Sequence, residues 1–146
     1  WHCLDINHIS ADSWNQDRWP NFALREFQCT HNGSCGMQHR FLDALQLLRS
    51  ALGFPFIITS GYRSLQHPLE TIKPHPGSHA LGCAADIGVY GERAYELVQA
   101  ATSLGMTGIG VMQSGSLAGR YIHLDNAESR PFEPRPMIWS YARQGD

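Results

Sequence analysis

The sequence predicts an α+β fold, in which a small antiparallel sheet of about four strands carries flanking helices. Two segments repeat apolar residues at helical spacing, and four short runs are rich in β-branched and aromatic residues. The two kinds of segment do not alternate regularly, which argues against a parallel α/β sheet. With 146 residues, of which 42% are hydrophobic and 16% charged, the chain has the size and composition of one globular domain spanning residues 1–146.

Both helices follow from apolar residues that recur every three or four positions. The first is predicted over residues 38–52 and ends before Gly53; its apolar residues are Phe41, Leu42, Leu45, Leu48 and Leu52. The second is predicted over residues 92–104 and ends at Gly105; its apolar face holds Ala94, Leu97, Val98 and Ala101.

The predicted strands are residues 56–59, 84–90, 106–112 and 121–125. The last two are separated by QSGSLAGR, a glycine- and serine-containing segment of hairpin length, so we expect them to pair antiparallel. The residues before about Phe27 and after Glu128 are rich in Pro, Trp and Asn, and we expect them to wrap the core as irregular structure.

Charge argues against a nucleic-acid partner, and hydropathy argues against a transmembrane segment. The formal net charge is −2 and no basic stripe is present, so we expect no nucleic-acid partner. The longest apolar run, residues 54–59, is far shorter than the ~20 residues of a transmembrane helix, so we expect no transmembrane segment. We expect a monomer. The chain begins at Trp1 without a signal-like apolar stretch, and we interpret it as a processed or trimmed product.

Four cysteines, Cys3, Cys29, Cys35 and Cys83, leave three arrangements open. They could form two disulfides in an oxidising compartment, or they could remain thiols. Alternatively, Cys29 and Cys35 could hold a structural zinc ion with His31 and His39, although their spacing matches a zinc knuckle poorly. The first two arrangements are favoured over the metal site.

A second pattern suggests a different metal site. In SHALGCAAD, residues 78–86, His79 and Asp86 stand among small residues that would let the backbone pack closely around an ion, and a strand that begins near Ala84 could bring them together. Alternation in YIHLD, residues 121–125, places His123 and Asp125 on one strand face. Two histidines and a carboxylate with a position left for water form a catalytic zinc arrangement. The competing interpretation is a set of surface polar residues or a hydrogen-bonded core pair.

The order of these motifs resembles a known family. SGYRS at 60–64, SHALGCAAD, GIGV at 108–111, YIHLD and WSY at 139–141 are similar to motifs of the zinc D-Ala-D-Ala carboxypeptidases, which include vancomycin-resistance D,D-peptidases and phage endolysins. That family shares its metal site with lysostaphin-type peptidases and the Hedgehog signalling domain. REFQC at 25–29 also resembles the segment that opens one branch of the family, so the similarity covers about residues 22–141.

The resemblance implies a ligand set and several roles. The zinc ligands would be His79, Asp86 and His123. Arg63 would stabilise the oxyanion of the tetrahedral intermediate, a role that suits a permanently charged guanidinium; its alternative is to brace a loop. Ser78 would bind substrate or brace the ligand loop, and Trp139 would line the substrate groove unless it only fills the core.

The general base is where the sequence departs from the family. Many relatives carry Glu or Asp three positions before the last histidine ligand, and this chain has Arg120 there. The remaining candidates are Asp125, Glu128 and Glu70. We favour Asp125 as the residue that moves the proton, because the branch resembled here has the same His-x-Asp ending. The alternative role of Asp125 is to orient a zinc-bound histidine or to pair with an arginine.

The residues themselves predict metal-assisted hydrolysis. The resemblance implies a zinc-dependent peptidase that hydrolyses stem peptides or cross-links of bacterial peptidoglycan, as a D,D-carboxypeptidase or an endopeptidase. Its place would be the periplasm, the outside of the cell, or the cell wall after delivery by a phage. One alternative is a non-catalytic, zinc-containing virion or wall-binding module, which Arg120 supports. Another is cleavage of an L,D bond by the same zinc ion.

Overall fold

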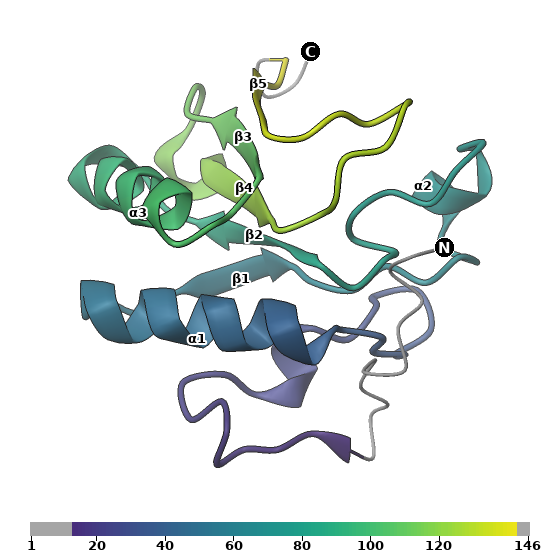
Figure 1. Cartoon of the computed structure of the whole chain (residues 1–146), viewed down its shortest axis with the longest axis horizontal. Coiled ribbons are helices and arrows are strands. Elements are labelled where there is room, and N and C mark those ends of the chain that lie inside the picture. The colour runs from purple at the N-terminus through teal and green to yellow at the C-terminus, as the bar shows by residue number, and fades with distance from the viewer. Residues whose placement is uncertain (1–12, 143–146) are drawn as a thin grey trace.

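A five-stranded sheet forms the centre of the protein in a computed structural model that describes residues 13–142 (Figure 1). The strands are β1 (Ile57–Ser60), β2 (Ala84–Gly88), β3 (Gly108–Met112), β4 (Tyr121–Asp125) and β5 (Met137–Ser140), and their order is β1-β2-β4-β3-β5. The predicted α+β class is confirmed. So is the antiparallel pairing of β3 with β4 across QSGSLAGR.

The sheet has one strand more than the roughly four that were expected. The additional strand, β5, pairs parallel with β3, so the sheet is mixed rather than wholly antiparallel. Three of its four residues are exposed, and Pro136 precedes it directly. An exposed edge strand next to a proline lacks the apolar alternation by which strands are predicted.

Two long helices lie close to their predicted limits. Helix α1 spans His39–Leu52, and Gly53 ends it in the left-handed conformation, with φ of 76°. Helix α3 spans Gly91–Ser103 and packs against α1 and β4. Three shorter helical turns were not predicted, namely α2 (Pro68–Thr71), η2 (Leu24–Glu26) and η3 (Leu117–Gly119). None of the helices within residues 13–142 has the length and apolar character to span a membrane.

The segment before α1 packs on the core as irregular structure, as expected for residues up to about Phe27. Trp19 is fully buried, and its indole N–H donates to Asp43 Oδ1 of α1 at 3.0 Å. Arg18 donates two further hydrogen bonds to the same carboxylate. These contacts fix the segment against the helix. Cys3 and Trp1 lie outside the described residues.

Alternation along the strands separates the two faces of the sheet. Ile87 of β2, Ile109 of β3 and Leu124 of β4 belong to the apolar core together with α1 and α3 residues. The intervening residues point to the other face, where the register aligns Asp86 of β2 with His123 of β4. Polar side chains are therefore gathered on one face while the other packs against the helices.

Glycines of β3 make room for these polar side chains. The register sets Gly110 opposite His123 and Gly108 opposite Asp125. A Cβ atom on Gly110 would lie 2.9 Å from His123 Cβ and 2.8 Å from Trp139 Nε1, and one on Gly108 would overlap the Asp125 carboxylate. The two glycines of the GIGV motif therefore leave space beside β4 for the side chains of His123 and Asp125.

Gly82 has a similar role in the loop before β2. The small residues of this loop were expected to pack around an ion, but Gly82 instead presses against the backbone of Gly36, with φ of 76°. Gln38 completes this contact: its backbone N–H donates to Gly82 O at 2.8 Å and its side chain to Leu81 O at 2.9 Å. The loop that carries His79 is therefore fixed to the segment that begins α1.

Gly82→Ala is expected to lower the free energy of unfolding by about 2 to 5 kcal/mol, because the Cβ atom adds an overlap with Gly36 O to the strain of a left-handed backbone. Gly53→Ala is the matched control. Gly53 has the same φ of 76°, but a Cβ atom there would have no neighbour within 4 Å, so its loss should be only ~1–2 kcal/mol. Urea unfolding measures both, and equal losses would contradict the proposed packing.

Candidate metal centre

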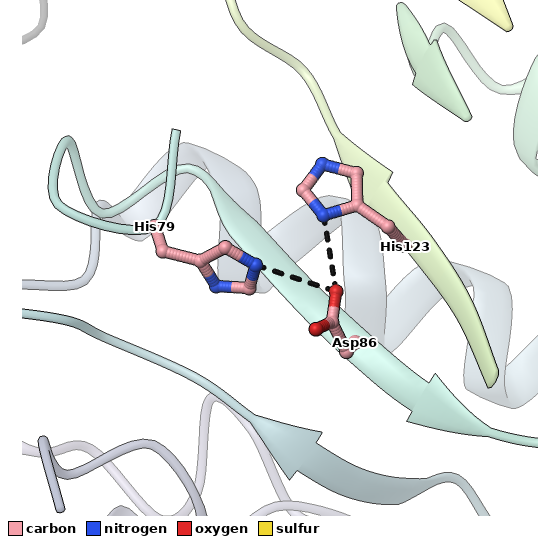
Figure 2. A group of neighbouring side chains, drawn as sticks. All are labelled: His79, Asp86 and His123. Atoms are coloured by element: carbon pink, nitrogen blue, oxygen red, sulfur yellow. Dashed lines mark hydrogen bonds and ion pairs between the residues drawn. The ribbon is translucent and has the colours of Figure 1, made fainter. Parts of the chain in front are cut away.

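Three side chains from separate parts of the chain converge on the polar face of the sheet. Asp86 comes from β2, His123 from β4, and His79 from the loop before β2 (Figure 2). Asp86 Oδ1 lies 3.3 Å from His79 Nε2 and 3.0 Å from His123 Nδ1. One donor atom from each residue can be chosen so that all lie within 4.8 Å of one another. The predicted ligand set is thus brought together.

The outer nitrogen of each histidine already has a partner. His79 Nδ1 lies 2.8 Å from the carbonyl oxygen of Gly61, which can only accept, so Nδ1 carries the hydrogen. His123 Nε2 lies 2.7 Å from Asp125 Oδ2. With these hydrogens placed outward, His79 Nε2 and His123 Nδ1 both direct lone pairs toward Asp86.

This arrangement fits a metal ion. Two lone pairs and a carboxylate that face one another repel unless a cation or a proton lies between them, and all three groups are zinc donors. Each histidine is held from behind by an acceptor, as metal-binding histidines are. Within residues 13–142 no fourth His, Cys, Asp or Glu joins the cluster, so positions remain for water and substrate.

The alternative metal site at Cys29 and Cys35 was wrong. The cluster of His79, Asp86 and His123 is the one group in the described part of the chain that could hold a metal ion. Cys29, Cys35 and Cys83 are buried thiols, and no disulfide joins any of them to another described residue.

Protons compete with a metal for this cluster. Burial alone would lower the pKa of His123, but the Asp125 and Asp86 carboxylates raise it above its ordinary value. Burial alone would raise the pKa of Asp86, and its hydrogen bonds with His123 and His79 lower it instead. Without a metal, His123 therefore holds its proton to a higher pH than usual.

Zinc affinity is consequently expected to increase with pH through neutrality. Because zinc must displace the proton of His123, whose pKa is raised, the competition extends above about pH 6.5. Titration against a chromophoric chelator at several pH values between about 6 and 8 measures this. A dissociation constant that does not change over that range would contradict the assigned protonation.

Asp125 lies behind the His123 ring rather than in front of it. Its side chain is fully buried, and Arg135 binds it through two hydrogen bonds, Nε to Oδ1 at 2.9 Å and Nη2 to Oδ2 at 2.8 Å. Ala127 N–H also donates to Oδ1. These contacts, with that to His123 Nε2, correspond to the alternative role weighed for Asp125: it orients a histidine and pairs with an arginine. A proton shuttle would need access to the opposite side of the ring.

Asp125→Asn is expected to weaken zinc binding about 10- to 100-fold, because the amide no longer fixes the orientation and basicity of His123 as the carboxylate does. Asp43→Asn is a matched control, since Asp43 also pairs with an arginine, Arg18, at 2.7 Å but lies on α1. Equilibrium zinc titration checks both variants. Equal affinity in the two would rule out this role for Asp125.

A groove of about 550 Å³ contains the metal cluster. Of the residues predicted to act there, Arg63, Ser78 and Trp139 line it with the three ligands. Glu70 and Glu128 do not line the groove. The Glu70 side chain is fully buried and forms ion pairs with Arg63 and Lys73. Glu128 is exposed and lines another cavity. Arg120, at the family's usual acid position, donates to Gly115 O in the β3–β4 connection.

The groove also contains residues that sequence reasoning did not assign. Lys73, Tyr121, Phe132, Glu133 and Arg135 line it, as does Tyr141, which was weighed with Trp139 as a groove residue. Burial is the first cause that raises the pKa of Tyr141 to about 12. Glu133 is anchored through Oε1 to Arg130 Nη2 at 2.9 Å and Arg135 Nη2 at 3.3 Å. Glu133 lies in the sequence between the motifs of His123 and Trp139, and this position was the signal by which sequence reasoning could have found it.

Two contacts join two loops that both contribute residues to the groove. The His75 ring stacks on Phe132 with a centroid separation of 3.8 Å. Arg130 Nη2 donates to Pro76 O at 3.1 Å. The loop of residues 73–77 and the loop of residues 128–136 therefore meet at these contacts.

Comparisons with known proteins agree with this geometry. A search of curated proteins finds no match. A family model described as Peptidase M15 matches residues 20–125. The matched region covers most of the chain and contains all three clustered side chains, His79, Asp86 and His123. The chain therefore belongs to the peptidase M15 family.

Proposed function

We propose that the protein is a zinc-dependent peptidase that hydrolyses a peptide bond in the stem peptides or cross-links of bacterial peptidoglycan, next to a D-amino acid. The observation that carries this proposal is the convergence of His79, Asp86 and His123 in a groove of a chain from a peptidase family. The peptidoglycan substrate and a location at the cell wall, reached by export or phage delivery, rest on the motif resemblance.

His79, Asp86 and His123 would hold the ion. When bound, zinc supplies Lewis acidity, which polarises a carbonyl and lowers the pKa of a coordinated water to about 7. His79 and His123 are kept in position by Gly61 O and Asp125, respectively. The protein thus presents the donors without rearrangement, which favours a preorganised site.

Arg63 would stabilise the charge that develops on the scissile carbonyl oxygen. Its guanidinium lines the groove, and Nη1 is held by Glu70 Oε2 at 3.3 Å. The guanidinium has five N–H donors and this contact uses one, so others can bind an oxyanion. Ser78 lines the same wall and can donate its hydroxyl to the substrate.

Glu133 is our proposed proton acceptor in place of Asp125. Apart from Asp86, it is the carboxylate that lines the groove among residues 13–142. As water adds to the carbonyl carbon, a water proton would pass to Glu133 Oε2. It would then move to the amine nitrogen as the C–N bond breaks. Both arginine contacts engage Oε1, which leaves Oε2 for this transfer.

The test is to incubate the purified, zinc-loaded protein with cross-linked peptidoglycan, with and without a chelator. We expect new amine termini that require the metal and do not form with the Asp86→Ala variant. Mass analysis of the fragments identifies the bond, and release at an L,D bond would replace the D,D assignment. Arg120 favours a non-catalytic wall-binding module as the second candidate. Chelator-insensitive binding without new amines would establish that module and exclude the peptidase.

A further inference from the structure

A buried carboxylate holds two cations against one wall of the groove. The Glu70 side chain is fully buried, and its Oε2 lies 2.7 Å from Lys73 Nζ and 3.3 Å from Arg63 Nη1. Its Oε1 accepts the Gly77 N–H at 2.9 Å. Burial alone would raise the pKa of Glu70, but Lys73, Gly77 and Arg63 lower it, so the carboxylate is ionised at neutral pH.

The cluster carries more positive charge than its own carboxylate neutralises. Two cations share one carboxylate, which leaves an excess of one positive charge in this cluster. Lys73 keeps 38% of its side chain exposed and lines the groove, and two of its three N–H donors remain after the bond with Glu70. The groove lining also includes the aromatic residues Tyr121, Trp139 and Tyr141.

The loop of residues 73–77 has anchoring contacts other than the Lys73 side chain. The Gly77 N–H already ties the loop of residues 73–77 to Glu70, and the loop is also held by the Arg130 contact with Pro76 O. The ammonium group instead lies over Gly77, where a Cβ atom would come within 2.9 Å of Nζ. Glu70 therefore positions the Lys73 ammonium group at the groove, next to Gly77, which precedes Ser78.

We propose that Lys73, positioned by Glu70 beside Arg63, binds a carboxylate of the substrate. This inference rests on the proposed peptidase function and adds a specificity residue to it. An ammonium–carboxylate hydrogen bond is among the stronger polar contacts, and Lys73 lines the groove with donors left for such a bond. Two sources of that carboxylate are chemically equivalent: the C-terminus of the peptide, or the α-carboxylate of a γ-linked acidic residue.

The structure favours the C-terminus. The His75–Phe132 stack and the Arg130–Pro76 hydrogen bond join the loop that carries Lys73 to the loop that carries Glu133, so a substrate chain would not pass between these two loops at that point. A chain end fits this arrangement better than a chain that continues, so Lys73 would direct the enzyme toward carboxypeptidase action.

Paired substrates test the assignment. The first pair is an N-acetylated peptide that ends in D-Ala-D-Ala, as the free acid and as the C-terminal amide. The second pair keeps the free C-terminus and carries the γ-linked D-glutamyl residue with its α-carboxylate free or amidated. Lys73→Gln should lower kcat/KM about 10- to 100-fold for the first acid, mainly through KM, and leave its amide unchanged. If the effect instead follows the second pair, the terminal source is wrong.

Variants separate binding from a general effect of charge. Lys73→Arg should restore most of the acid preference, because it keeps the positive charge. Arg25→Gln removes a positive charge from an exposed position outside the groove and should behave as the wild type. If Lys73→Gln retains the wild-type preference for acid over amide in both pairs, the proposal is overturned.

A labelling experiment gives a readout other than activity. Lys73 is the one lysine in the sequence, so acetylation by an amine-reactive ester can be followed at a single side chain, with the chain's N-terminal amine as internal reference. Saturating acid should slow Lys73 acetylation, whereas the amide should not, in a short pulse on the zinc-loaded protein. Equal labelling with both ligands would also refute the subsite. If neither peptide is hydrolysed but the acid alone protects Lys73, the peptidase proposal fails while the carboxylate site stands.

Discussion

Replacing Asp86 by alanine is expected to remove zinc from the protein and to lower kcat/KM by about 10³-fold or more. Asp86 Oδ1 lies within 3.3 Å of both histidines, so it is the donor shared by the whole cluster. Its carboxylate also supplies the one negative charge among the three donors. A bound metal contributes several kcal/mol to transition-state stabilisation, and each 1.36 kcal/mol corresponds to a factor of ten in rate.

Zinc content and hydrolysis have to be measured on the same preparation of this variant. Asp17→Ala is the control, because Asp17 is exposed and lies outside the groove. Circular dichroism and thermal unfolding show whether the variant remains folded. A folded Asp86→Ala protein that retains stoichiometric zinc would mean that the ion is bound elsewhere. Full hydrolytic activity without zinc would contradict the metal mechanism itself.

The convergence of the three candidate ligands could be predicted because local patterns determine their positions. Strand alternation places Asp86 and His123 on one face, and once the two strands are neighbours their register makes them partners. His79 needs only a short loop before β2 to reach them. The same reasoning located α1 and α3, whose apolar residues repeat with helical periodicity and whose ends are near glycines.

The contacts of Asp125 could not be predicted in this way. Alternation correctly placed Asp125 on the face of His123, but whether it faces solvent or protein depends on Arg135, ten residues further along an irregular segment. No periodicity relates these two residues. The same segment leads into β5, whose exposed residues do not show the pattern of a strand, so the strand was not predicted although its residue Trp139 was expected to line the groove.

Resemblance located the departure at Arg120 but did not indicate what replaces the missing acid. Arg130, Glu133 and Arg135 form an ion-paired set in the loop of residues 128–136, which brings a carboxylate to the groove from a later part of the chain. The position of this carboxylate depends on tertiary contacts between loops, here with Pro76 and His75. Local sequence therefore indicated the candidate metal donors more readily than the proposed acid.

Glu133→Gln is expected to lower kcat by about 10²- to 10⁴-fold while zinc content stays at the wild-type level, because the amide cannot accept the proton that water must lose. Glutamine keeps an oxygen that can accept from Arg130 and Arg135, so the loop should remain in place. Loss of a proton acceptor should also remove the acidic limb of the kcat/KM pH profile. A merely structural defect would lower activity without changing the shape of that profile.

Glu128→Gln is the matched control for this experiment. Glu128 lies in the same irregular segment but is exposed and borders a different cavity, so its replacement should leave kcat and the pH profile unchanged. Comparison with Asp125→Asn then separates two functions of carboxylates near His123. The Asp125 variant should lose zinc affinity and recover activity at high zinc, whereas the Glu133 variant should stay inactive however much zinc is added. The opposite pattern would return the proton-transfer role to Asp125, because added zinc repairs a loss of metal affinity but not a loss of proton transfer.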